Sequence, residues 1–209
     1  MDREGESTGT AAIDFWFEFG SNYSYLSVMR IEEAAARAGV EVRWQPFLLG
    51  PIFRDFGWQT SHFVLQKEKG AYVWKDMERQ CRKYGLPWTR PTAFPRSAVL
   101  PLRIALIGRA QPWMGAFCRQ VMRRNFVEDR DIDSVNAMRE VLSELGLPAQ
   151  EILDEAQSEA NKLSLRRQTE TAKERGIFGA PTFFVGEEMF WGNDRLDDAL
   201  AFCGRAEPH

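Results

Sequence analysis

Hydrophobic and polar positions change their spacing several times along the chain, and each change predicts a different kind of element. Residues 13–19 are rich in aromatic side chains, carry acidic residues near both ends and predict a strand. From Tyr23 to Ala38 apolar residues recur every three or four positions, which predicts a helix that Gly39 ends. Residues 40–47 alternate again and predict a second strand. A strand, a helix and a strand in this order form a βαβ unit, whose strands run parallel.

Helical patterns fill the centre of the chain, from about residue 67 to residue 168, and strand patterns are almost absent there. Five helices are expected before residue 160, around Trp74, Val99, Phe117, Met138 and Ile152. Pro95 and Arg96 are expected to open the second of these helices, and Ser134 is expected to cap the fourth.

The mixed pattern returns near the end of the chain. A helix is predicted from about Leu163 to Arg175. The β-branched and aromatic residues 182–185 and the apolar residues 189–191 flank a glycine turn and predict a hairpin. A last helix is expected from Arg195 to about Cys203.

The order of these elements predicts an α/β, thioredoxin-like fold with an all-helical domain inserted between its βαβ and ββα halves. Residues 13–60 and 163–205 would form the thioredoxin-like domain. Residues 61–162 would form the inserted helical domain, and residues 1–12 a disordered lead-in.

Composition and charge narrow the class of protein. A net charge of −3 and an isoelectric point of about 5.6 argue against a nucleic-acid surface. No apolar run approaches the ~20 residues that span a bilayer, and the polar start has no apolar core of a secretory signal. The three cysteines, Cys81, Cys118 and Cys203, form no C-x-x-C pair, and the first two fall on apolar helix faces as packing residues would. We expect a cytoplasmic protein that acts on a small-molecule substrate and binds neither nucleic acid nor membrane.

The sequence lacks the residues that a metal site or a serine-hydrolase site would need. The two histidines, His62 and His209, and three scattered cysteines offer no ligand cluster, so no metal site is predicted. A serine-hydrolase triad would have to use His62, and the chain has no Gly-x-Ser-x-Gly elbow.

Ser21-Asn22-Tyr23-Ser24 stands where the first strand passes into the first helix. In redox thioredoxin folds this junction carries two cysteines, because a helix start stabilises a thiolate. Serine cannot exchange disulfides, so that reaction is lost here. Two readings of Ser21 remain: a helix cap, or a hydroxyl that donates a hydrogen bond to the thiolate of a bound ligand.

Two later segments could complete a ligand site. Pro181 precedes a strand and could simply end the helix before it; in a thioredoxin-like fold it would be cis and would present the backbone of Ala180 beside the first helix. That backbone could bind an extended peptide such as glutathione. Asn193 or Asp194 could cap the last helix, or Asp194 and Arg195 could hold the charged groups of a γ-glutamyl moiety.

Four segments in order resemble 2-hydroxychromene-2-carboxylate isomerases and kappa-class glutathione transferases: residues 17–26, 47–53, 176–186 and 190–196. The resemblance runs from about residue 13 to residue 203. It implies glutathione as cofactor and a homodimer, with Ser21 against the glutathione sulfur. The glutathione site that it implies consists of Ala180, Pro181, Asn193, Asp194, Arg195 and, where the family commonly has lysine, Arg54.

The chain departs from this family at other positions. Asn22 replaces a common proline, and Trp58 replaces a common asparagine. Phe53, Trp58 and Trp88 could form an aromatic wall for a ring substrate, although we favour core positions for them.

Three functions follow from the resemblance. The first is a cis–trans isomerase that recycles glutathione while acting on a conjugated aromatic ketoacid. The second is a kappa-type transferase or peroxidase that consumes glutathione. The third is a thiol- or peptide-binding module without catalysis. A disulfide oxidoreductase is least favoured, because the site has no cysteine.

Overall fold

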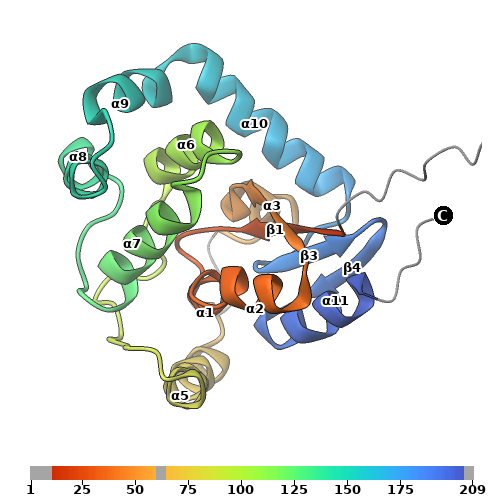
Figure 1. The fold of residues 1–209 in the computed structure, drawn as a ribbon. Coiled ribbons are helices and arrows are strands. Elements are labelled where there is room, and N and C mark those ends of the chain that lie inside the picture. Colours follow the sequence, from red (N-terminus) through yellow and green to blue (C-terminus); the bar gives the residue numbers. More distant parts are fainter. Residues whose placement is uncertain (1–10, 60–64, 205–209) are drawn as a thin grey trace, which may run out of the picture.

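The structure, a computed structural model, describes residues 11–59 and 65–204, and its strands form one mixed sheet of order β2-β1-β3-β4 (Figure 1). β1 (Ala12–Phe17) and β2 (Glu41–Pro46) run parallel, as the βαβ pattern predicts. β3 (Thr182–Val185) pairs antiparallel with β1 and forms the predicted hairpin with β4 (Glu188–Trp191). The α/β thioredoxin-like fold with additional helices is therefore confirmed.

The helix expected from Tyr23 to Ala38 is two helices, α1 (Asn22–Val28) and α2 (Ile31–Ala38), so the prediction of one helix is wrong. Arg30 leaves helical geometry, with φ at −122°. Its guanidinium donates to the Asn193 side chain at 3.0 Å, 163 residues further along the chain. The break therefore follows from a tertiary contact that local spacing cannot reveal.

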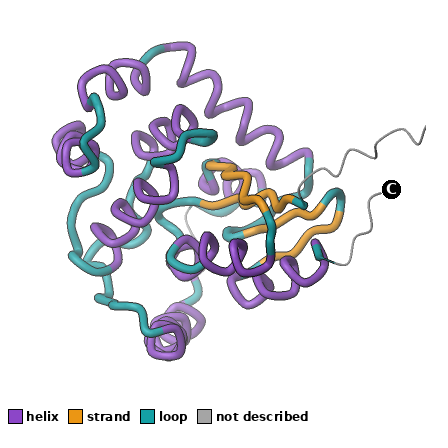
Figure 2. Tube along the Cα trace, in the orientation of Figure 1, coloured by secondary structure: helices purple, strands orange, loops and turns teal. Residues whose placement is uncertain are grey.

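Helices make up most of the chain between β2 and β3 in sequence (Figure 2). Residues 67–168, all of them described, contain no strand. The helices after β2 are α3 (Leu49–Asp55), α5 (Lys67–Tyr84), α6 (Val99–Gly108), α7 (Met114–Phe126), α8 (Val135–Glu144), α9 (Ala149–Gln157) and α10 (Glu159–Glu174). The 3-10 turn η1 (Asn193–Arg195) and α11 (Leu196–Cys203) end the described chain.

Three helix starts show which helix boundaries the local sequence predicts correctly. Ser134 caps α8 as predicted, since its hydroxyl accepts the Ala137 N–H at 3.2 Å. The helix expected to open at Pro95 begins instead at Val99, where the distant Asp133 carboxylate accepts the Leu100 N–H at 2.7 Å. α10 begins before the predicted Leu163, and α3 was not predicted at all.

The central strand β1 is covered on both faces. Phe15 and Phe17 point into one hydrophobic cluster, and Trp16 points into the other, as the two-residue period of a strand requires. α2 and α11 lie against the first face, and α10 runs along the other (Figure 1). Cys81 and Cys118 are buried, which confirms their packing role.

Several predictions fall at or beyond the limits of the described chain. β1 begins at Ala12, so the lead-in expected over residues 1–12 is at least one residue too long; residues 1–10, His62 and His209 lie outside the described residues. The predicted domain limits stay predictions, and α10 runs across the limit proposed at residue 163. Within the described residues, no helix combines the length and the apolar character needed to cross a membrane.

Candidate active site

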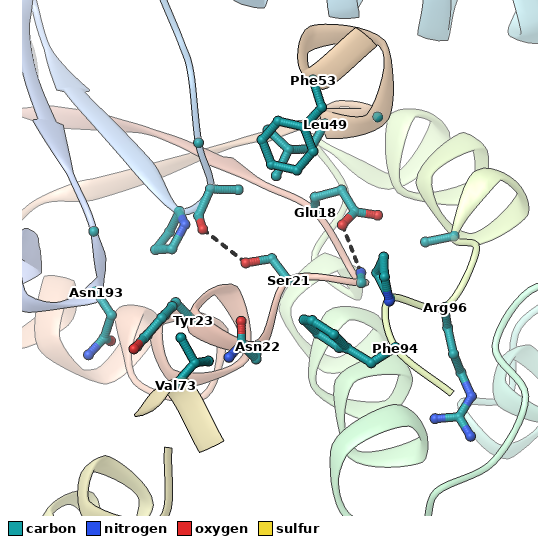
Figure 3. Close-up of a pocket in the computed structure, with 18 of the residues that line it drawn as sticks. Glu18, Ser21, Asn22, Tyr23, Leu49, Phe53, Val73, Phe94, Arg96 and Asn193 are labelled. Carbon is teal, nitrogen blue, oxygen red and sulfur yellow. Dashed lines mark hydrogen bonds between the residues drawn. The ribbon is translucent and has the colours of Figure 1, made fainter. Parts of the chain in front are cut away.

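A cavity of about 930 Å³ opens where the sheet meets the helices that follow β2 (Figure 3). Its walls come from the β1–α1 turn, α3, α5, the segment 94–99, and the turns that precede β3 and follow β4. This volume lies at the upper end of the range of about 300–1,000 Å³ that is typical of small-molecule sites. Residues 11–59 and 65–204 contain no group of three His, Cys, Asp or Glu side chains that could hold a metal ion.

Ser21 lies on this cavity and makes two hydrogen bonds with its hydroxyl group. The oxygen accepts the Ser24 N–H at 3.2 Å, so Ser21 caps α1. The hydroxyl donates to the Ala180 carbonyl at 2.9 Å (Figure 3). The two readings of Ser21 are therefore compatible: it is a helix cap whose hydroxyl faces the cavity. Because α1 has only seven residues, the hydroxyl and the neighbouring backbone matter more here than a helix dipole.

The Ala180–Pro181 peptide bond is cis, as expected for this fold. It places the Ala180 backbone against Ser21, although the two residues are 159 positions apart. The turn before it is tightly packed, since a side chain at Gly179 would place its Cβ 2.3 Å from the indole nitrogen of Trp191. A rigid backbone edge thus lies beside the Ser21 hydroxyl.

Asn193, Asp194 and Arg195 all line the cavity, but they differ in their surroundings. Asn193 is buried, and its carbonyl oxygen accepts from Ser27 at 3.1 Å and from Arg30 at 3.0 Å. Asn193 therefore anchors η1 beneath α1. Asp194 and Arg195 are exposed at the rim, 3.7 Å apart between the guanidinium Nε and the carboxylate, so both charges can reach a ligand.

All the predicted site residues lie on this one cavity. Arg54 reaches it from α3. The full set is Ser21, Arg54, Ala180, Pro181, Asn193, Asp194 and Arg195. Their roles toward a ligand stay predictions.

The fold separates Trp88 from the other two aromatic residues proposed as a wall. Phe53 is buried and lines the cavity, whereas Trp88 is half-buried and packs against the core residues Tyr25 and Phe126. Trp58 is partly exposed and packs against Phe53. The favoured core position is therefore confirmed for Phe53 and wrong for Trp58, and Trp88 lies at the edge of the core.

Sequence reasoning missed Glu18, which lies in the cavity wall between two buried phenylalanines. Its carboxylate accepts the Gly20 N–H at 2.9 Å (Figure 3). The pKa of Glu18 is raised from an ordinary 4.5 to about 7, chiefly by burial and to a smaller extent by nearby Asp133, against the lowering effect of the backbone N–H groups of Gly20 and Ser21. An acidic residue inside an aromatic run is the signal that could have identified it.

Helix α5 closes the cavity on a side that the sequence did not predict. The Tyr23 hydroxyl donates to Asp76 of α5 at 2.7 Å. Between them and the segment 94–99 lies Asn22, which is 1% exposed and whose amide nitrogen has no hydrogen-bond partner in the described chain. Arg96 fixes the segment 94–99, since its guanidinium binds Asn125 at 2.9 Å and Asp129 at 2.6 Å.

Comparison with known proteins assigns the chain to a family. Residues 12–202 match the DSBA-like thioredoxin domain family. A 2-hydroxychromene-2-carboxylate isomerase of Sphingobium xenophagum is 32% identical over 90% of this chain and 95% of its own, and one of Pseudomonas putida is 30% identical over 92% and 94%.

Comparison with solved structures supports the same family assignment. A structure of 2-hydroxychromene-2-carboxylate isomerase, 28% identical, superposes with a TM-score of 0.83 over 93% of this chain and 95% of its own. A probable DsbA oxidoreductase of Streptomyces coelicolor, 20% identical, has a TM-score of 0.72 over 95% and 92% and shares the fold. The chain therefore belongs to the 2-hydroxychromene-2-carboxylate isomerase family, on a DsbA-like thioredoxin fold.

Proposed function

We propose that this protein is a glutathione-dependent cis–trans isomerase that acts on a conjugated aromatic ketoacid of the 2-hydroxychromene-2-carboxylate type. Membership of the family supports the reaction class. The observation that carries the proposal is the Ser21 hydroxyl, which faces the cavity beside the Ala180 carbonyl at the place where redox relatives of the fold need a cysteine.

The positions of the cysteines support an external thiol. Cys81, Cys118 and Cys203 are all buried, and burial raises the pKa of each thiol. None of them lines the cavity, so a thiol nucleophile in this site has to arrive with a ligand. The chain supplies the groups that would hold that ligand in place.

The described residues fit glutathione, a peptide with charged ends and a thiol. The backbone at Ala180 and Pro181 offers a strand-like edge to an extended peptide. Asp194 and Arg195 at the rim offer one charge of each sign to a γ-glutamyl group with its amine and carboxylate. Ser21 can turn its hydroxyl from Ala180 toward a sulfur and donate to it.

Bound glutathione would supply a thiolate, whose reversible addition to a conjugated double bond allows rotation about that bond. Ser21 would stabilise the thiolate by donating its hydroxyl hydrogen. Arg54, which lines the same cavity from α3, would attract a carboxylate of the bound glutathione. Phe53 and Leu49 provide apolar wall for an aromatic ring (Figure 3).

The test is conversion of 2-hydroxychromene-2-carboxylate by the purified protein with a small amount of glutathione, followed by absorbance while free thiol is counted. We expect many turnovers for each glutathione with no loss of thiol, and a strong decrease for Ser21→Ala. Stoichiometric loss of thiol would identify a transferase instead. Binding of glutathione without conversion of this or related ketoacids would identify a non-catalytic module.

A further inference from the structure

Glu18 is an ionisable group of the cavity to which the proposed function gives no role. It stands three residues before Ser21, and its side chain reaches the cavity beside Leu49 and Phe53 (Figure 3). One carboxylate oxygen, Oε2, is occupied by the Gly20 N–H at 2.9 Å. Within the described residues the second oxygen, Oε1, makes no further hydrogen bond and is left for a ligand or a water molecule.

The turn that carries Ser21 holds this carboxylate in place. A side chain at Gly20 would put its Cβ 2.8 Å from the Arg96 carbonyl oxygen and 3.0 Å from Oε2 of Glu18. Glycine is therefore required, because the carboxylate and the segment 94–99 both press against the backbone there. The Ser21 N–H donates to the main-chain carbonyl of Glu18 at 3.1 Å and also lowers the pKa of its carboxyl.

Within residues 11–59 and 65–204, no cation forms an ion pair with Glu18. Arg96 also lines the cavity, but its guanidinium binds Asn125 and Asp129. Asp133 adds negative charge, and its own carboxylate binds Ser97 and the Leu100 N–H. Burial therefore dominates and raises the pKa of Glu18 to about 7.

We propose that Glu18 is the proton acceptor of the site: its Oε1 takes the proton of the thiol that Ser21 receives, directly or through one water molecule, and returns it when the ligand leaves. This inference rests on the proposed function. The S–H bond breaks, an O–H bond forms on Glu18, and the sulfur keeps the electron pair. The net charge of the pair does not change, and two adjacent anions are avoided.

A purely structural role makes a different prediction. Glu18→Gln keeps an oxygen acceptor for the Gly20 N–H, so the turn should persist, but the amide cannot take up a proton. Circular dichroism and thermal unfolding would show that the variant folds. Glu151→Gln, which removes an exposed carboxylate from α9, is the matched control.

The first measurement counts protons released on glutathione binding, by calorimetry in buffers of different ionisation enthalpy. S-methylglutathione, which has no thiol proton, is subtracted. In the wild type the corrected number of released protons should fall from about one at pH 6 to near zero at pH 8. At pH 8 Glu18 is unprotonated before binding, so it takes up the thiol proton and keeps it within the site. In Glu18→Gln the number should fall only to about three quarters of a proton at pH 8, because about a quarter of free glutathione is already thiolate there. A fall in Glu18→Gln equal to that of the wild type would overturn the inference.

The second measurement needs only the wild type, which covers the case in which Glu18→Gln does not fold. An infrared difference spectrum at pH 8 should gain a carboxylic-acid C=O band on addition of glutathione and gain none with S-methylglutathione. Glutathione binding as thiolate without that band would overturn the role of Glu18 and leave the proposed function intact. Absence of glutathione binding at millimolar concentration would overturn both.

Discussion

Replacement of Ser21 by alanine removes the cap of α1 and the proposed hydrogen bond to the bound thiolate, and the two losses can be measured separately. The cap on the Ser24 N–H, at 3.2 Å, contributes about 1 kcal/mol to the free energy of unfolding. A hydrogen bond from the same hydroxyl to a thiolate is worth about 1.5–3 kcal/mol, because the acceptor is charged. At about 1.36 kcal/mol for each pKa unit, Ser21→Ala should raise the pKa of the bound glutathione thiol by about one to two units.

The assay follows the ultraviolet absorbance of the thiolate of bound glutathione against pH, and urea unfolding measures stability. Ser134→Ala is the matched control, because Ser134 caps α8 with the same 3.2 Å bond and does not line the cavity. Ser134→Ala should lose about 1 kcal/mol of stability, and Ser21→Ala about 1 kcal/mol more, because its hydroxyl also donates to the Ala180 carbonyl. Only Ser21→Ala should change the pKa of the bound thiol.

The reasoning is refuted if Ser21→Ala loses stability as Ser134→Ala does and still binds glutathione with the wild-type thiol pKa. Ser21 would then be a helix cap, and the thiolate would owe its stability to the backbone around Ala180 or to another group of the cavity.

Three further substitutions test other parts of the account. Glu18→Gln should be more stable than the wild type above pH 7 by at most about 3 kcal/mol: burial raises the pKa of Glu18 from 4.5 to about 7, so the stability that its protonation contributes is present below pH 4.5 and lost as the pH rises to 7. Equal stability at pH 8 would contradict this. Gly20→Ala should lower the free energy of unfolding by about 1–3 kcal/mol, because its Cβ would lie 2.8 Å from the Arg96 carbonyl. Unchanged urea unfolding would show that this turn can yield. Asn22→Pro should raise the thermal unfolding midpoint, with a gain of about 1 kcal/mol, because proline suits the first residue of a helix and the variant removes a buried amide without a partner. A lowered midpoint would mean that the Asn22 amide has a partner in solution.

Elements whose signals are local could be predicted from the sequence. The β-branched and apolar runs of the hairpin on either side of its glycine turn, the left-handed Gly39 at the end of α2 and the Ser134 cap of α8 each depend on a few neighbouring residues. The order of these elements was then sufficient to predict the fold. It also placed the Ala180–Pro181 backbone beside Ser21.

Features that depend on distant partners could not be predicted. The break between α1 and α2 is set by the contact of Arg30 with Asn193, and the start of α6 by Asp133. The wall that α5 contributes, through Tyr23 and Asp76, joins residues 53 positions apart. For these positions spacing and propensity give no information, because the deciding interaction forms only in the folded chain.

The raised pKa of Glu18 is another feature that depends on the folded structure and could not be predicted. A sequence shows an acidic residue between Phe17 and Phe19, but the burial of its carboxyl and the nearby Asp133 carboxylate appear only in three dimensions. Acidic residues that interrupt an aromatic strand near a helix start are therefore worth testing as functional groups before they are assigned to the surface.

The central claim is that a thiol bound at Ser21 drives isomerisation, and the most direct measurement compares glutathione with S-methylglutathione in the conversion of 2-hydroxychromene-2-carboxylate. We expect turnover with glutathione and none with S-methylglutathione, which should instead compete with glutathione for the site. Equal rates with the two peptides, or the same rate without either, would contradict the claim, since neither result requires a thiolate at Ser21.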